Sequence, residues 1–297
     1  MIRIIFLGTA GATPTKARAL PSIAIEYDGE IYLFDCGEGT QRQFLKYNIN
    51  LSKISSIFLS HVHADHVIGI VGLIRTLAIN KRIKPLFIYI PKNEENKIRT
   101  LINFDNPIIN FEIIVNGIST GRIIKNKKIT VSSFKLNHSV LTYGYVFKEN
   151  DKIHFFKNKS KELGLRGKMF AEILNKKQIT IKNKLIKLSD ISFLETGKKI
   201  IYATDTRPCK STIKNSMNAD VLIHETTYIE KLKNLAKERK HSTTLETANI
   251  AKQSNVKKLI VFHISARYKN ANILLKEIKA VFKNSEIAKD GLIIELK

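Results

Sequence analysis

Three histidines and one aspartate lie within six residues of this chain, in the segment HVHADH at positions 61–66. The apolar run Ile57-Phe58-Leu59 comes shortly before it, so the segment is expected to follow a buried strand. Imidazole nitrogens bind zinc and similar ions, and a carboxylate oxygen can complete or bridge such a site. The first two histidines could share one ion, and the aspartate and third histidine could reach a second. An ordinary polar loop is the alternative, and the clustering favours the two-metal site.

Further candidate ligands follow other apolar runs of the sequence. Such runs end close before His138, Asp205 and His263. The carboxyl ends of strands in an α/β sheet face a common crevice, so residues far apart in sequence can meet there. We therefore expect these three residues to join the histidine cluster in one site. His154 has no comparable setting and is interpreted as an ordinary polar residue.

The elements that must position these residues are short apolar runs that alternate with helical patterns, which indicates the α/β class. The first 35 residues read as strands, with a hairpin turn at Asp28-Gly29. Thr243 and Glu246 form the capping-box signature of a helix start. Further strands are expected around residues 57–59, 87–90, 111–115, 200–202, 221–223 and 259–262, and helices at 69–79, 93–101, 243–253 and 273–282.

Length and composition restrict the class of protein further. The 297 residues, of which 43% are hydrophobic, suffice for one large or two small globular domains. Cys36 and Cys209 are the only cysteines, so neither a disulfide framework nor a thiolate zinc site is expected. No apolar run approaches the eighteen residues of a membrane span. These features indicate a soluble, cytoplasmic protein with no membrane partner.

The charge of the chain points to an acidic partner. Fifty Lys and Arg residues against 26 Asp and Glu give a formal net charge of +24, which attracts a phosphate backbone. A compositional bias that spreads lysine over every surface would give the same total. Residues 151–190, however, carry eleven Lys or Arg and four Asp or Glu. This clustering favours a basic projection that contacts nucleic acid over a merely solvated helix and hairpin.

Sequence motifs over most of the chain resemble a known family. The pattern HxHxDH with a later His, Asp and His resembles the metallo-β-lactamase superfamily. A sharper resemblance is to the ribonuclease Z family, in its short form, the endonucleases that process tRNA 3′ ends. It rests on FLGTAGATPTKARALPS, DCGEGTQRQ, HVHADH, NHSVLTYGY, YATDTRP, IHETTY, KHSTT and HISARY, which occur in this order between residues 6 and 268. The blocks DCGEGTQRQ, HET and HST distinguish this branch from lactamase-like and thioester-hydrolase relatives.

The resemblance implies a fold, a metal content and a set of ligands. The fold would be a four-layer αβ/βα sandwich formed by residues 1–297 as a single domain, with residues 151–190 as an inserted basic arm that grips the elbow of tRNA. The subunit would hold two zinc ions and pair into a homodimer. One zinc ion would be bound by His61, His63 and His138, the other by Asp65, His66 and His263, and Asp205 would bridge the two.

It also implies how precursor tRNA would be cut. Asp65 would accept the proton of a metal-activated water that attacks the phosphorus. His241, oriented by Glu225, would protonate the departing O3′. The tRNA would keep a 3′-hydroxyl and the trailer a 5′-phosphate. His224 is expected to support this site from behind rather than to bind metal.

Substrate contacts and departures from the family pattern complete the implied site. Lys16 and Arg18 match a P-x-K-x-R-N loop near the RNA 3′ end, but Ala19 stands at its Asn position. Arg267 could contact a phosphate or form a structural salt bridge. The arm carries GLRGKM where a Gly-Pro-rich tip is usual.

Two other functions compete with a tRNA endonuclease. One is a small-molecule esterase or phosphodiesterase, and the other is a non-catalytic RNA-binding module.

Overall fold

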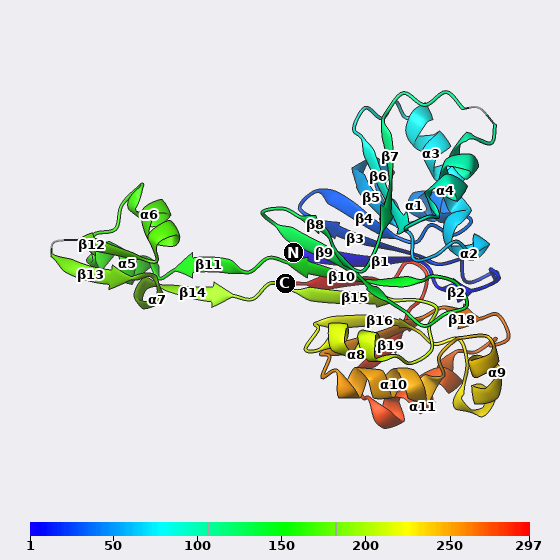
Figure 1. The fold of residues 1–297 in the computed structure, drawn as a ribbon. Coiled ribbons are helices and arrows are strands. Elements are labelled where there is room, and N and C mark those ends of the chain that lie inside the picture. The colour runs from blue at the N-terminus through cyan, green and yellow to red at the C-terminus, as the bar shows by residue number, and fades with distance from the viewer. Residues whose placement is uncertain (106, 182) are drawn as a thin grey trace.

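The computed structural model describes residues 1–105, 107–181 and 183–297. Within these residues the body of the protein contains two seven-stranded mixed sheets (Figure 1). The first has the order β20 (Ile293–Leu296), β1 (Ile2–Gly8), β3 (Ser22–Tyr27), β4 (Glu30–Phe34), β5 (Ile54–Phe58), β6 (Leu86–Pro91) and β7 (Ile113–Ile118). The second has the order β19 (Ser285–Ile287), β17 (Lys258–Phe262), β16 (Val221–Glu225), β15 (Lys199–Ala203), β10 (Tyr143–Glu149), β9 (Ile129–Lys135) and β8 (Gly121–Lys125). A short parallel pair, β2 (Ala10–Gly11) and β18 (Ile264–Ser265), joins residues from the two halves of the chain.

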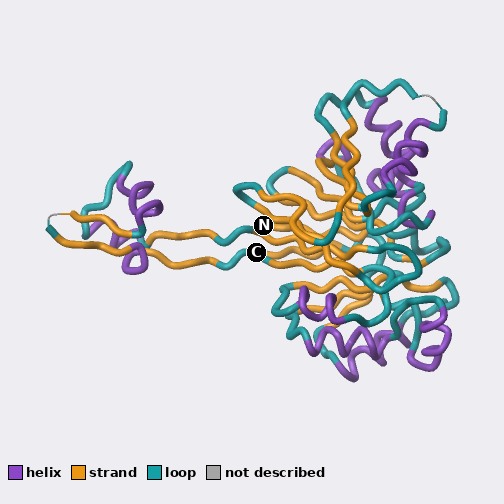
Figure 2. The backbone as a smooth tube through the Cα atoms, in the orientation of Figure 1, coloured by secondary structure: helices purple, strands orange, loops and turns teal. Residues whose placement is uncertain are grey.

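The two sheets face each other across an aromatic-rich core. Phe34 and Phe58 from the first sheet meet Tyr145 and Tyr202 from the second, with ring centroids 5.5–5.7 Å apart. Helices cover the outer faces (Figure 2). The first sheet is covered by α1 (Thr40–Lys46), α3 (Gly69–Ile79) and α4 (Glu95–Asn103), and the second by α8 (Lys210–Ser216), α10 (Thr244–Gln253) and α11 (Asn272–Val281). The α/β class expected from the sequence is therefore confirmed.

Shorter helical segments connect these layers. They are α2 (Ala64–Val67), α9 (Lys233–Glu238) and the 3₁₀ turns Leu51–Lys53 and Glu230–Leu232. The helix at α10 begins as the sequence predicts, because Thr243 and Glu246 form a complete capping box. Among the residues that the structure describes, no helix combines the length and apolar character needed to cross a membrane.

Two predicted elements begin later than the sequence suggests. The helix expected from residue 93 begins at Glu95, because Asn93 has a φ of 74° and cannot enter a right-handed helix. The strand expected at 111–115 is β7, which begins at Ile113. Phe111 instead lies before the strand, buried in the core beneath the guanidinium of Arg82. The Asp28-Gly29 turn is as expected, with φ values of 53° and 82°, the left-handed pair of a type I′ hairpin.

Between β10 and β15 the chain leaves the body and returns (Figure 1). This excursion is the arm, and its base is the antiparallel pair β11 (Lys152–Phe155) and β14 (Ser192–Glu195). Beyond this pair lie α5 (Lys157–Glu162), α6 (Met169–Lys176), the hairpin β12 (Gln178–Ile181) and β13 (Lys184–Lys187), and α7 (Leu188–Ile191). A small core of its own holds the tip together, formed by Leu165, Ile173, Ile186, Leu188 and Ile191. Lys182, part of the basic run, lies outside the described residues.

Candidate metal centre

The seven residues expected to bind metal converge at one edge of the two facing sheets. His61 follows β5 of the first sheet, and α2 carries Asp65 and His66 into the same space. The other three segments come from the second sheet, where His138, Asp205 and His263 follow β9, β15 and β17. The crevice therefore lies between the edges of two sheets. The sequence pattern had instead suggested the strand ends of a single sheet.

The first set of ligand atoms contains His61, His63, His138 and Asp205. The His63 Nδ1 lies 2.9 Å from the His61 Nε2 and 3.4 Å from the His138 Nε2. The Asp205 Oδ2 lies 3.8 Å and 3.6 Å from the same two Nε2 atoms. All four atoms lie within 4.8 Å of one another, so a single ion could contact each of them.

The second set contains Asp65, His66, His263 and the other oxygen of Asp205. The Asp65 Oδ2 lies 3.4 Å from the His66 Nε2 and 3.7 Å from the His263 Nε2. The Asp205 Oδ1 lies 3.5 Å and 3.1 Å from these nitrogens. Asp205 thus turns one oxygen to each set, which is the arrangement of a carboxylate that bridges two ions.

Hydrogen bonds behind the ligands fix which nitrogen of each histidine faces the centre. The Ser60 hydroxyl donates to Asp35 at 2.9 Å and so accepts from the His61 Nδ1 at 2.8 Å. The His66 Nδ1 donates to Asp35 at 2.7 Å. In both rings the proton therefore lies on Nδ1, and the Nε2 lone pair is free to bind a metal.

The two remaining Nε2 ligands are oriented in the same way. The His138 Nδ1 donates to the Lys240 carbonyl at 3.1 Å. The Thr227 hydroxyl donates to Glu225 at 2.7 Å, so it accepts from the His263 Nδ1 at 2.9 Å. Acceptors outside the ligand sets thus hold the Nδ1 atoms of four histidines, so that each Nε2 faces the centre.

The chemistry of these residues fits a pair of divalent cations. Among the described residues, the buried Nε2 atoms of His66 and His263 have no hydrogen-bond partner, as expected of atoms that bind metal. Burial lowers the pKa of His61 well below the usual range. Burial also lowers the pKa of His66, but Asp205, Asp35 and Asp65 outweigh it and raise this pKa well above the usual range, so positive charge is required beside these carboxylates. A metal ion that displaces the proton supplies that charge.

His241 and Glu225 lie beside the ligand sets. The Glu225 Oε1 accepts from the His241 Nδ1 at 2.9 Å and from the backbone N–H groups of Thr206 and Ser242, each at 3.0 Å. Burial lowers the pKa of His241, but the carboxylates of Glu225 and Asp205 raise it more, to about 9 with these protein groups alone. These carboxylates thus favour the protonated form of the ring, whose Nδ1 is held by Glu225. Asp205, His241 and His263 also form a third group of atoms within 4.8 Å.

His224 lies away from the metal-binding atoms. Its Nδ1 lies 2.7 Å from the Glu225 carbonyl and 3.4 Å from the Thr247 hydroxyl of α10. It belongs to none of the three ligand groups found in the described part of the chain. Direct ligation by His224 is thus not favoured, in line with the supporting role expected from the sequence.

An open cavity of about 380 Å³ lies over the ligands. It is lined by His63, Asp65, His138, Asp205, His241 and His263, together with Ala12, Ser139, Tyr228, Leu235, Arg239 and Arg267. The guanidinium of Arg267 lies 4.9 Å from the centre of the Tyr228 ring and forms no ion pair among the described residues. Its position at the cavity favours a substrate contact over a salt bridge.

The other two expected substrate contacts lie on the loop between β2 and β3. Lys16 is exposed there. Arg18 is partly buried, and its Nη1 donates to the Thr9 hydroxyl and the Ala288 carbonyl, each at 2.6 Å. Arg18 therefore anchors the loop through its Nη1, and Lys16 is exposed on the same loop.

Asp35, Thr227 and Arg207 lie around the candidate site and were not predicted from the sequence. Asp35 and Thr227 orient histidine ligands, and Arg207 contacts the loop that carries His241. They lie in the family motifs DCGEGTQRQ, IHETTY and YATDTRP, respectively. Their place in these motifs is the feature of the sequence that could have identified them. Asp35 and His263 also have left-handed φ values of 55° and 60°, which are rare for residues other than glycine and often mark functional sites.

Gly11 is required by the close packing of β2 against His263. A Cβ atom at this position would lie 2.5 Å from the His263 Nδ1 and 2.9 Å from its carbonyl oxygen. We expect Gly11→Ala to displace the ring and to lower metal retention and catalytic activity, the latter roughly 100-fold, the cost of a 1 Å misplacement. Metal content and the single-turnover rate measure this. Gly72→Ala is the matched control, since its Cβ meets only the flexible end of Gln41; a Gly11→Ala protein equal to this control would refute the expectation.

Comparisons with known proteins agree with the geometry. The structure matches the metallo-β-lactamase fold protein YhfI from Bacillus subtilis with a TM-score of 0.71 at 20% identity, over 99% of this chain and 98% of that one. It matches the human tRNase Z, short form, with a TM-score of 0.73 at 23% identity, over 99% of both chains. The chain therefore has the metallo-β-lactamase fold, and its histidine and aspartate clusters lie together at the edge of the two sheets.

Sequence similarity narrows this class to one family. A ribonuclease Z from Archaeoglobus fulgidus is 39% identical over 303 residues, which cover 100% of this chain and 98% of that protein. The family model of tRNase Z endonucleases matches residues 10–69. The chain belongs to the ribonuclease Z family, and it is a tRNA 3′-processing endonuclease. This confirms the resemblance and the expectation of a nuclease, against a small-molecule hydrolase or a non-catalytic RNA-binding module.

Proposed function

We propose that the enzyme removes the 3′ trailer of precursor tRNA with two zinc ions per subunit, leaving a 3′-hydroxyl on the tRNA and a 5′-phosphate on the trailer. The observation that carries this proposal is Asp205, whose two carboxylate oxygens each face one set of histidine ligands. End analysis tests the products. We expect a tRNA that a CCA-adding enzyme extends and a trailer that can be 5′-labelled only after phosphatase treatment. The opposite end groups would contradict the proposal.

We propose that each of the two groups of closely spaced ligand atoms binds one ion. His61, His63 and His138 would hold one ion, and Asp65, His66 and His263 the other, with Asp205 between them. When bound, two zinc ions lower the pKa of a water and neutralise charge on the reacting phosphate. Zinc is favoured because five imidazoles and two carboxylates suit it better than magnesium or calcium.

Two residues would move the protons of the reaction. The Asp65 Oδ2 accepts the Ala12 N–H at 3.1 Å, and its carboxylate faces the cavity, where it can take a proton from the attacking water. The water oxygen forms a bond to phosphorus while the bond from phosphorus to O3′ breaks. His241, held through Nδ1 by Glu225, would give its Nε2 proton to O3′.

Substrate binding is proposed to extend beyond the cavity. Residues 1–297 would form one domain with the basic arm at 151–190, and Lys16, Arg18 and Arg267 would contact the RNA near the cleavage site. The arm projects from the side of the body opposite α2 and α9, which border the cavity (Figure 1), and there it could bind the elbow of a tRNA held by the partner of a homodimer. Cys36 and Cys209 are free, which supports the expected cytoplasmic location.

Replacing the arm beyond its base should separate RNA binding from chemistry. Because β11 pairs with β14, exchange of residues 156–191 for a two-residue Asn-Gly turn keeps this base paired. We expect weaker tRNA binding with a shallower salt dependence, since fewer phosphates are contacted. Hydrolysis of bis-p-nitrophenyl phosphate should remain at the level of the unmodified enzyme. A parallel collapse of small-diester hydrolysis would show instead that the arm is structural.

A further inference from the structure

Arg207 connects three segments of the centre. It lies two residues after Asp205, and its backbone N–H donates to the Asn137 carbonyl at 2.8 Å, next to the ligand His138. The Thr206 hydroxyl accepts from the Asn137 N–H at 3.0 Å and strengthens this junction. The backbone of Arg207 is thereby fixed to two ligand segments of the second sheet.

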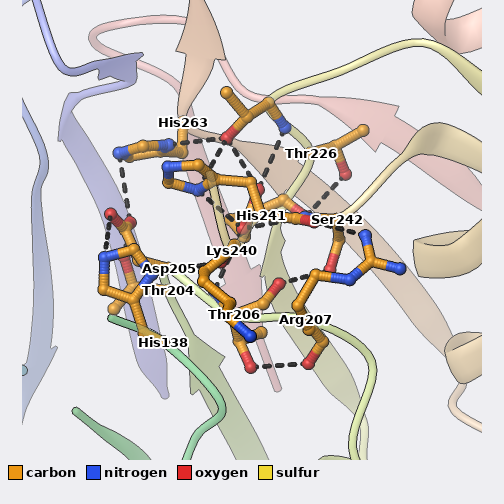
Figure 3. A network of polar contacts seen from close by, with 12 residues as sticks. His138, Thr204, Asp205, Thr206, Arg207, Thr226, Lys240, His241, Ser242 and His263 are labelled. Atoms are coloured by element: carbon orange, nitrogen blue, oxygen red, sulfur yellow. Dashed lines mark hydrogen bonds and ion pairs between the residues drawn. The ribbon is translucent and has the colours of Figure 1, made fainter. Parts of the chain in front are cut away.

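The Arg207 side chain reaches the third segment, the loop that carries His241 (Figure 3). Its Nη1 donates to the His241 carbonyl at 2.6 Å and to the Glu246 Oε2 at 2.8 Å, and its Nη2 pairs with the other oxygen of Glu246. The Arg207 and Glu246 side chains are only 13% and 14% exposed, so water screens this bidentate contact weakly.

Glu246 is itself held in place by the start of α10. Its Oε2 accepts the Thr243 N–H at 3.0 Å, and the Thr243 hydroxyl completes the capping box. The Arg207 guanidinium therefore joins a rigid helix end to the loop after β15. His241 lies between them, with its backbone held by Arg207 and its ring held by Glu225.

Other hydrogen bonds also hold the loop at 240–242, since the His241 N–H donates to the Ala236 carbonyl at 2.8 Å and the Ser242 N–H donates to Glu225 at 3.0 Å. Lys240 has a left-handed φ of 59°, and its carbonyl accepts from the ligand His138. The Ser242 hydroxyl donates to the Thr206 carbonyl at 2.6 Å, again next to Arg207 (Figure 3). A shift of this loop would move the proton donor relative to the bound phosphate while the two ligand sets kept most of their contacts.

We infer that Arg207 is a positioning residue for the protonation of O3′, acting through the His241 carbonyl and the Glu246 carboxylate. The inference rests on the proposed role of His241 as proton donor. In the step concerned, the phosphorus–O3′ bond breaks and the proton of the His241 Nε2 passes to O3′. An ion pair that merely stabilises the start of α10 would not affect this step selectively.

A precursor tRNA with sulfur in place of O3′ at the cleavage site distinguishes these roles, because a thiolate leaves without a proton. Arg207→Gln should slow single-turnover cleavage of the oxygen linkage by roughly 10- to 100-fold, a part of the 10²- to 10⁴-fold that a positioned acid contributes. Cleavage of the sulfur linkage should change less than about threefold, as in His241→Ala. Zinc content and thermal midpoint are measured in parallel.

Arg75→Gln is the matched control. Arg75 likewise binds a main-chain carbonyl, that of Ile102 at 2.8 Å, and a carboxylate, that of Asp105, but on α3 and far from the cavity. The Arg75→Gln enzyme should cleave the oxygen and the sulfur linkage at the rates of the unmodified enzyme. Arg207→Lys, which keeps the charge but loses the two-pronged contact, should show the same selectivity with a smaller loss and serves if the glutamine variant does not fold.

The outcomes separate this inference from the proposed function. Equal losses on both linkages, loss of zinc, or no loss on either linkage in the Arg207 variants would overturn the positioning role. A His241→Ala enzyme without selectivity between the linkages would overturn the proton-donor assignment on which it rests. Unmodified enzyme that cuts neither RNA would contradict the proposed function itself.

Discussion

Replacement of His66 by alanine is expected to abolish cleavage of precursor tRNA while binding of the RNA largely persists. The buried His66 Nε2 has no hydrogen-bond partner among the described residues and faces both Asp65 and Asp205. Its removal takes one ligand from the second set and leaves those carboxylates without their nearest cation. Because Lewis-acid stabilisation is worth several kcal/mol, cleavage should fall by about 1,000-fold or more. For the proposed two-zinc centre, the metal content should fall toward one ion per chain.

RNA affinity is the internal control for this variant. The basic arm lies on the opposite side of the body from α2, which carries His66 (Figure 1), so a filter-binding or gel-shift constant for uncleaved precursor should change little. Asp220→Ala is a useful second control, since Asp220 pairs with Lys257 away from the cavity. Loss of RNA binding together with cleavage would mean that metal binding and the RNA surface are not separable in this protein.

Replacement of His241 by alanine should lower cleavage by about 10²- to 10⁴-fold, the usual contribution of a positioned general acid. The zinc content should stay at its unmodified value, because the two ligand sets are complete without this ring. The measurement is a single-turnover rate at saturating enzyme, which excludes RNA binding and product release from the result.

The zinc content of His241→Ala also tests an alternative role. The His241 ring belongs to a third group of possible ligands with Asp205 and His263. If the variant loses an ion in proportion to its activity, His241 is a ligand and not the proton donor. The bond from its Nδ1 to Glu225 is compatible with either role, so the metal analysis decides between them.

Much of the metal centre could be predicted from the sequence because its residue types are rare and its motifs are local. HVHADH places four possible metal ligands directly after a strand. His138, Asp205 and His263 each follow an apolar run. The meeting of ligands from two different sheets could not be predicted in this way. It depends on the packing of aromatic side chains between the sheets, which has no local signature.

The residues behind the ligands were harder to predict for a physical reason. Asp, Ser, Thr and Arg are common in loops, and only coordinates show that Asp35 meets His66 or that Arg207 meets the His241 carbonyl. The predicted starts of α4 and β7 were wrong for a related reason. The left-handed φ of Asn93 delays the start of α4, and the burial of Phe111 keeps it outside β7.

The most direct test is to map the end of the product formed from a 5′-labelled precursor tRNA with a 3′ trailer, incubated with zinc-loaded protein with and without a chelator. We expect a single cut directly after the discriminator base, which the chelator abolishes and added zinc restores. Zinc-loaded protein that leaves this RNA intact but still hydrolyses a small diester, or a cut that persists in the chelator, would contradict a metal-dependent tRNA 3′ endonuclease.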